Sequence, residues 1–152
     1  MKHILVTTDF SEAAESAFGY AKDQLKLAGK GKNKITLLKV IDVVPPAGIK
    51  FEYGLAIADK KGMLEKVYKH ASEQMQEIAK KQFAGLPVET AVIKPKKAVY
   101  QEIIKFAETN SVSLIVMSTH GRTGVKHFLL GSVAERVVRR SPCPVMIVPA
   151  KS

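Results

Sequence analysis

Short apolar runs alternate along the chain with longer stretches in which apolar residues recur every three or four positions. The compact runs are rich in β-branched residues and are typical of buried strands; they cover residues 4–6, 35–41, 88–93, 112–117 and 144–148. The longer stretches have the spacing of amphipathic helices and cover residues 12–28, 63–83, 97–109 and 131–140. This order predicts an α/β fold: a doubly wound, five-stranded parallel sheet with helices on both faces.

One stretch departs from this pattern: residues 116–133, which read VMSTHGRTGVKHFLLGSV. Small, polar and glycine residues follow the end of a strand, and Gly131 and Ser132 then begin a helix. The free N–H groups at a helix N-terminus, the helix dipole and a serine hydroxyl all favour an anion. Glycines let the backbone approach a ligand closely. The stretch therefore predicts a phosphate-binding loop.

Asp9 is the second candidate site residue, because it directly follows the first strand. In doubly wound sheets, ligands bind beyond the carboxyl ends of the strands, at the point where the strand order reverses. If the first and fourth strands are neighbours there, Asp9 and the glycine stretch face one crevice. The carboxylate would accept hydrogen bonds from ribose hydroxyls. Alternatively, Asp9 has a structural role in capping the next helix, beside Ser11.

Length and composition indicate one soluble domain, residues 1–152. The chain is 46% hydrophobic and 25% charged, and we find no apolar run long enough to span a membrane. The segment MKHILVTTDF reads as a strand rather than a signal peptide. A single cysteine, Cys143, excludes a disulfide within one chain, so we expect a reducing cytoplasmic location and a buried, inert thiol.

The net charge of +10 raises nucleic-acid binding as a hypothesis. The lysines come in small groups at predicted loops and helix ends, without the interleaved aromatic residues that stack on bases. A solvated basic surface is therefore favoured over nucleic-acid binding. Residues 43–59, which contain two prolines and two glycines, are predicted to form a long loop of the kind that is functional or mobile. Met63 and Met75 have helical spacing and are expected in the core.

The sequence offers little for catalysis or metal binding. It contains no GxxxxGK[ST] loop, and no GxGxxG follows the first strand. His120 and His127 are seven residues apart, without a cysteine or clustered carboxylates, so no metal site is predicted. No evident base would position water, and no carboxylate beyond Asp9 is dedicated to Mg²⁺. We predict a binding protein without catalytic residues, leaving room only for slow ATP hydrolysis.

Four segments together resemble the universal stress protein family, in its nucleotide-binding branch: TTDFSE, LLKVID, the glycine stretch and SPCPVMIVP. The resemblance covers almost the whole chain and implies the strand order 3-2-1-4-5. It also implies an adenine nucleotide such as ATP (with Mg²⁺), AMP or cyclic AMP. Adenine would lie near Thr7, Thr8 and Val40, ribose on Asp9, and the phosphates on Gly121, Gly131 and Ser132. The other candidate contacts are Met117, Ser118, His120, Arg122 and Val133.

The family's phosphate motif, Gly-x2-Gly-x9-Gly-Ser/Thr, fits this chain with one departure. Counting back from Gly131 and Ser132 gives Gly121 as the second motif glycine and puts Ser118 in place of the first. The serine side chain would crowd the phosphates, restrict φ, or simply fit if the local backbone is extended. Arg122 and Lys126 would pair with phosphates or only solvate the loop.

The resemblance implies a cytoplasmic stress-response regulator, a sensor or switch that acts on a protein partner not identified by the sequence. It also implies a homodimer in which the last strand, residues 144–148, pairs with its twin. An apolar strand at a sheet edge is a liability unless it is paired. The alternative is a dimeric protein-interaction module that binds no nucleotide, with Ser118 marking a closed site.

Overall fold

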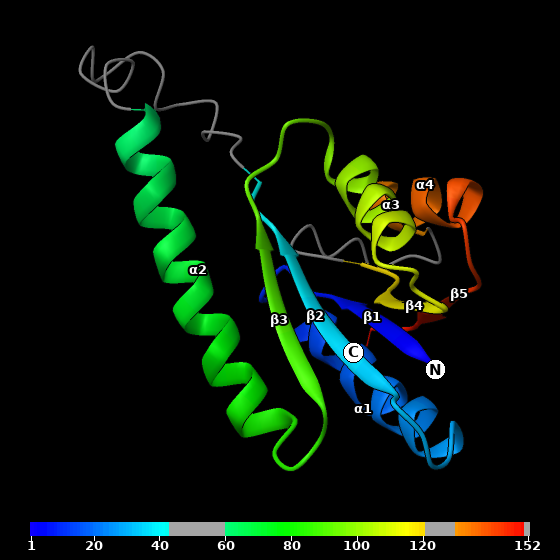
Figure 1. Ribbon diagram of the computed structural model, residues 1–152. Helices are drawn as coiled ribbons and strands as arrows, with labels where there is room; N and C mark the ends of the chain where they lie inside the picture. Colours follow the sequence, from blue (N-terminus) through cyan, green and yellow to red (C-terminus); the bar gives the residue numbers. More distant parts are fainter. Residues whose placement is uncertain (43–59, 121–129, 151–152) are drawn as a thin grey trace.

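The computed structural model describes residues 1–42, 60–120 and 130–150. Their strands form one parallel sheet in the order β3-β2-β1-β4-β5. The predicted fold class and strand order are therefore confirmed. Figure 1 shows the strands as neighbouring arrows. Their bounds are β1 His3–Thr7, β2 Lys34–Val40, β3 Val88–Ile93, β4 Leu114–Ser118 and β5 Val145–Val148.

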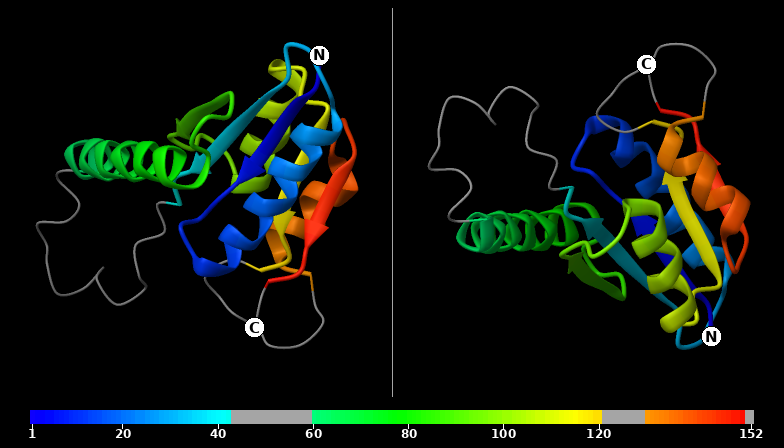
Figure 2. Two further views of the ribbon diagram at one scale, coloured as in Figure 1. Left: turned by 90° about the horizontal axis from the view of Figure 1, so that it is seen from below. Right: turned by 90° about the horizontal axis from the view of Figure 1, so that it is seen from above.

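Helices cover both faces of the sheet, as predicted (Figures 1 and 2). One apolar core contains residues of the sheet together with Phe18 and Met75, and the other contains Ile103 and Val137. Successive strand residues point to opposite faces, so Val6 enters the first core and Leu5 the second. The helix bounds are α1 Glu12–Leu27, α2 Lys60–Gln82, α3 Val99–Thr109 and α4 Ser132–Arg140.

The position of β1 follows from its composition. Ile4, Leu5 and Val6 are completely buried, because helices cover both sides of the central strand. At one edge, β3 is partly buried along its length except at Glu89, which is exposed. The other edge strand, β5, is partly buried along Val145, Met146 and Ile147.

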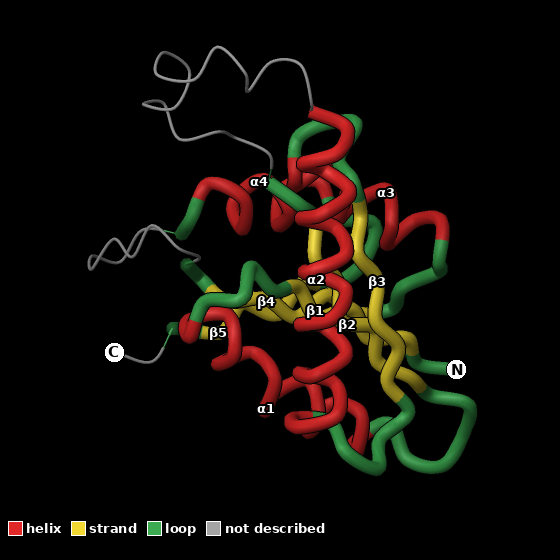
Figure 3. Tube along the Cα trace, turned by 90° about the vertical axis from the view of Figure 1, so that its left-hand side faces the viewer, coloured by secondary structure: helices red, strands yellow, loops and turns green. Residues whose placement is uncertain are grey.

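The core prediction for α2 is wrong in its first turns. Met75 is completely buried, but Met63 is 55% and Val67 is 43% exposed. The reason is geometric, because the N-terminal part of α2 runs beyond the end of the sheet and has no strand beneath it (Figures 1 and 3). The prediction for Cys143 is wrong as well, since this free cysteine is only half-buried.

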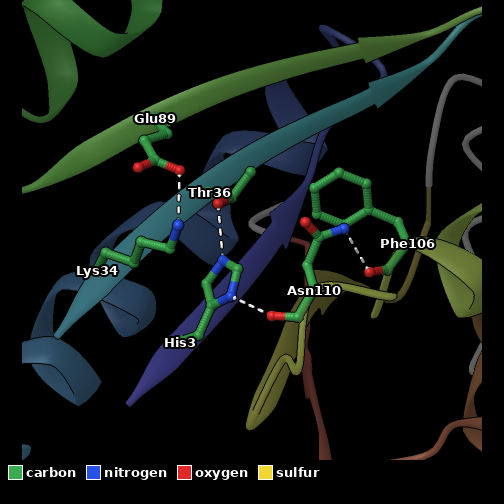
Figure 4. Close-up of polar contacts among 6 residues, drawn as sticks. All are labelled: His3, Lys34, Thr36, Glu89, Phe106 and Asn110. Carbon is green, nitrogen blue, oxygen red and sulfur yellow. Dashed lines mark hydrogen bonds and ion pairs between the residues drawn. The ribbon is translucent and has the colours of Figure 1, made fainter. Parts of the chain in front are cut away.

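A polar network ties together the amino end of the sheet (Figure 4). The His3 side chain is buried, and its Nδ1 and Nε2 lie 3.0 Å from the carbonyl oxygen of Asn110 and 2.8 Å from Oγ1 of Thr36. The backbone N–H of His3 donates to Oγ of Ser113, which donates to the carbonyl oxygen of His3. His3 thus joins β1 to β2 and to the C-terminus of α3.

Candidate functional site

A pocket of about 290 Å³ lies at the carboxyl ends of β1, β2 and β4. The strand order reverses between β1 and β4, the place where ligands bind in doubly wound sheets. Ten of the twelve candidate site residues line this pocket, and the other two, Gly121 and Arg122, lie outside the described residues. The predicted loop 43–59 and Lys126 also lie outside them. The ten are Thr7, Thr8, Asp9, Val40, Met117, Ser118, His120, Gly131, Ser132 and Val133.

One wall of the pocket is apolar. It is formed by side chains that belong to the core on the α3 and α4 side of the sheet: Leu38, Val40, Ile103, Met117 and Ala134. Apolar side chains from β2, β4, α3 and α4 together present a surface suited to a flat apolar ring. Polar lining residues follow the ends of β1 and β4 and form what we call the polar side of the pocket: Thr8, Asp9, Thr119 and His120. The pocket therefore offers an apolar part and a polar part to one ligand.

The turn between β1 and α1 holds Asp9 at the pocket. Oδ1 of Asp9 accepts hydrogen bonds from the backbone N–H and the hydroxyl of Ser11. Ser11 is the N-cap of α1, and its Oγ accepts from the N–H of Ala14 at 3.2 Å. Asp9 therefore supports the cap rather than being the cap itself. Because it also lines the pocket, the structural role and the ligand role predicted for it are compatible.

The same turn contains a strained residue. Phe10 has a φ of 68°, a backbone conformation that costs free energy in a bulky residue, and its N–H donates to Oγ1 of Thr8 at 3.0 Å. The Phe10 ring lies 5.2 Å from Nζ of Lys39, a cation–π contact. Strain of this kind is common where a loop is held in place for binding.

Ser118 ends β4 in extended backbone. It pairs with Val148 of β5, and among the described residues positive φ occurs outside glycine only at Phe10 and Ser111. Of the effects expected for a serine at this position, restriction of φ is thus absent, because the backbone is of the kind that any residue adopts. Its Oγ is buried and has no hydrogen-bond partner in the described part of the chain.

Gly131 is required for close packing at the start of α4. Its N–H donates to the carbonyl oxygen of Thr119 at 2.8 Å, and a Cβ at this position would lie 2.9 Å from the same oxygen. Gly131 is also the N-cap of α4, and among the described residues no side chain caps this helix. In contrast to α1, the N–H groups of the first turn of α4 therefore have no side-chain partner in the described part of the chain, and the residues of this turn line the pocket.

His120 follows Ser118 and Thr119. Its Nδ1 lies 2.9 Å from Oγ1 of Thr119, which accepts a hydrogen bond from the N–H of Ala150 at 3.2 Å. Nε2 of His120 is buried without a partner among the described residues. The polar side of the pocket thus combines an uncapped helix N-terminus with two buried, unpartnered polar atoms. Such a donor set fits the phosphates of a nucleotide.

Sequence reasoning missed three polar residues of the pocket lining: Lys39, Asp42 and Thr119. Lys39 is only 6% exposed. A lysine inside the apolar run of a strand expected to be buried was a usable signal, because buried lysines need a partner or a function. Asp42 and Thr119 follow the ends of β2 and β4. Their position just after a predicted strand was the only sequence feature that could have marked them as pocket residues.

Two structural absences hold within the described residues. No group of three or more His, Cys, Asp or Glu side chains there is placed to hold a metal ion. Over the same part of the chain, no helix is long and apolar enough to cross a membrane.

The chain is similar to known proteins over nearly its whole length. A model of the universal stress protein family matches residues 1–149. Universal stress protein MJ0577 of Methanocaldococcus jannaschii is 33% identical over 160 residues, covering 99% of this chain and 96% of the relative. The solved structure of MJ0577 superposes with a TM-score of 0.77 at 33% identity and covers 99% of this chain and 97% of its own.

Two structures of lower identity share the fold. The universal stress protein from Archaeoglobus fulgidus in complex with dAMP has a TM-score of 0.56 at 19% identity, with 97% of this chain and 98% of that chain covered. A family protein from Arabidopsis thaliana with AMP bound has a TM-score of 0.55 at 17% identity, with 100% and 94% covered. The resemblance expected from the sequence motifs is confirmed: the chain belongs to the universal stress protein family.

Proposed function

We propose that this protein binds an adenine nucleotide in the pocket between β1 and β4 and acts as a stress-response sensor or switch. The observation that carries the proposal is the convergence of residues from separate segments on one pocket at the reversal of strand order. Two solved family structures of the same fold hold AMP or dAMP, which supports an adenine nucleotide as the ligand class.

The proposed pose follows the chemistry of the two sides of the pocket. Adenine packs against the apolar wall near Val40 and Met117, and the ribose hydroxyls donate to the carboxylate of Asp9. The phosphates lie at the uncapped N-terminus of α4, where Gly131 allows close approach and Ser132 offers a hydroxyl. Gly121 and Arg122 would complete this phosphate site. Mg²⁺ would then be carried on the phosphates of ATP.

Thermal unfolding tests the proposal, with Gly131→Asp as the key variant. At about 100 times its dissociation constant, a ligand stabilises the fold by roughly 2.7 kcal/mol, which raises the Tm by several degrees. ATP with Mg²⁺, AMP and cyclic AMP should each be compared. Gly131→Asp should abolish the shift, because its side chain would collide with Thr119 and repel the phosphates.

Gly19→Asp is the matched control. It introduces the same side chain on the exposed side of α1, where a Cβ meets nothing within 4 Å, so it should keep the ligand-induced shift. Nucleotide released from heat-denatured protein would identify the ligand directly. If none of the three nucleotides shifts the Tm of the wild-type protein and none is released, the protein is instead a nucleotide-free interaction module.

We also propose that the protein is a cytoplasmic homodimer joined through residues 144–148. In a parallel pair, the backbone groups of alternate residues bond to the neighbouring strand. Since the carbonyl groups of Pro144 and Val148 accept from β4, the N–H and C=O groups of Val145 and Ile147 face outward from the edge. These outward groups are available for pairing with a second copy.

Ile147→Pro tests this dimer. Proline removes an outward N–H without removing a bond to β4, so we expect the dimer to dissociate while the monomer stays folded. Sedimentation velocity gives the mass of each species, and Ile147→Val, which retains the N–H, should remain dimeric. A wild-type protein that sediments as a monomer at micromolar concentration would contradict the dimer.

A further inference from the structure

Two neighbouring polar side chains of the pocket lining have no hydrogen-bond partner in the described part of the chain. They are Ser118, whose Oγ is buried, and His120, whose Nε2 is buried. Ser118 as a residue is only 8% exposed. Folded proteins satisfy nearly all buried polar atoms, so two such atoms with no partner among the described residues are candidates for hydrogen bonds to a ligand.

Thr119 lies between Ala150 and His120. Its Oγ1 accepts from the N–H of Ala150 and lies 2.9 Å from Nδ1 of His120. In the tautomer in which the Thr119 hydroxyl donates to Nδ1, the neutral imidazole carries its proton on Nε2, which is then a donor. His120 in this tautomer and the hydroxyl of Ser118 can both donate to a ligand.

Both residues line the pocket. Ser118 shares the strand face of Leu114 and Val116, which is the α1 side, and the pocket reaches that side at Ala14. The Cα of His120 lies 3.8 Å from the position of a Cβ on Gly131, at the start of α4. Together with the N–H groups of the first turn of α4, they make a site built from donors.

A site of donors selects a ligand group that only accepts. A phosphate ester meets this requirement, since its oxygens carry negative charge and hydrogen bonds to charged groups are stronger than neutral ones. A nucleoside has no negatively charged acceptor of this kind. The family motif has glycine where this chain has Ser118, so the serine hydroxyl is an additional donor that the motif alone would not provide.

We infer that Ser118 and His120 are specificity-determining residues that donate hydrogen bonds to a ligand phosphate and make the pocket select a nucleotide over its nucleoside. The inference rests on the proposed nucleotide site and adds to it the residues that read the phosphate. Ser118 then binds the phosphate instead of crowding it.

Calorimetric titration with AMP and with adenosine tests the inference. Ser118→Ala and His120→Leu each remove one donor and should weaken AMP binding about tenfold or more, with adenosine affinity unchanged within about twofold. Ser118→Thr keeps the hydroxyl, and His120→Gln keeps an N–H donor near the position of Nε2. Both conservative variants should retain most of the AMP affinity.

The Tm of the ligand-free variants separates binding from a structural role. Because Oγ of Ser118 has no partner in the described part of the chain, Ser118→Ala should unfold at the wild-type temperature or above. Wild-type AMP affinity in both Ser118→Ala and His120→Leu would overturn the inference but leave the proposed function standing. Equal loss of AMP and adenosine affinity would overturn it too. A wild-type protein that binds neither compound would overturn both the inference and the proposed function.

Discussion

The two ends of the sheet use the same kinds of side chain in opposite ways. At the amino end, the ring of His3 bonds to Thr36 and to the Asn110 carbonyl (Figure 4), and Ser113 bonds to the backbone of His3. At the carboxyl end, Ser118, Thr119 and His120 follow one another, yet Ser118 and His120 each keep a buried polar atom without a partner among the described residues. The polar side chains at the amino end therefore stabilise the fold, and those at the carboxyl end are available to bind a ligand.

The contrast extends to the helix ends. The Asn110 carbonyl at the C-terminus of α3 is bonded to His3, whereas no side chain of the described residues caps the N-terminus of α4. Unpaired buried groups are costly, so a protein retains them where binding compensates for the cost. The same residue types thus occur in a structural cluster and in a candidate binding site. What distinguishes the two is whether their polar atoms already have hydrogen-bond partners.

The largest effect on stability is expected at the amino end, from His3→Ala. The substitution removes a buried ring and leaves Oγ1 of Thr36 and the Asn110 carbonyl without their partner. We expect a loss of about 3 kcal/mol in the free energy of unfolding, or roughly 6–12 °C in Tm. Urea denaturation provides the measurement, and His70→Ala on the exposed side of α2 is the matched control. A loss below about 1 kcal/mol would show that the network around His3 contributes little to the stability of the fold.

A matched pair of serine variants sharpens the comparison. Oγ of Ser113 accepts from the N–H of His3 and donates to its carbonyl oxygen, so Ser113→Ala should cost about 1 kcal/mol of stability. Ser118→Ala should cost about nothing in the ligand-free protein, because no hydrogen bond is lost. Equal destabilisation by the two substitutions, measured by urea denaturation, would remove the distinction between the two ends.

The smallest effect concerns the exposed part of the amino end. Nζ of Lys34 lies 2.8 Å from Oε2 of Glu89, whose side chain is 60% exposed (Figure 4). Ion pairs in solvent contribute little, so Glu89→Gln should change the free energy of unfolding by less than about 0.5 kcal/mol. Raising the salt concentration should not alter that small difference by much. A loss comparable to that of His3→Ala would mean that burial does not decide which polar contacts stabilise this end.

Much of the fold was predictable because the local spacing of apolar residues indicates each strand and helix. Strand and helix periodicities gave the elements to within a few residues, and buried Ile4 to Val6 marked the central strand. The prediction that Met63 lies in the core was wrong, because periodicity identifies the apolar side of a helix but not how far the sheet beneath that helix extends. For Cys143, flanking apolar residues indicated burial that the edge position of β5 does not provide.

The pocket was predictable in part for a related reason. Strand ends and glycines are visible in the sequence, so Asp9, Ser118 and Gly131 could be found as lining residues. The extended backbone of Ser118 and its unpartnered hydroxyl depend on pairing with β5, a contact between distant segments. Lys39 was missed because apolar neighbours on both sides made the strand resemble plain core.

Backbone amide chemical shifts during an AMP titration test the comparison most directly. We predict the largest changes at Ser118, His120 and residues 131–134, with smaller ones at Thr8 and Asp9, because these amides border the pocket. The amides of His3, Thr36 and Ser113 should not move. Unchanged amides around the pocket at saturating AMP and ATP, or changes centred on the amino end, would contradict the assignment of binding to the carboxyl end of the sheet.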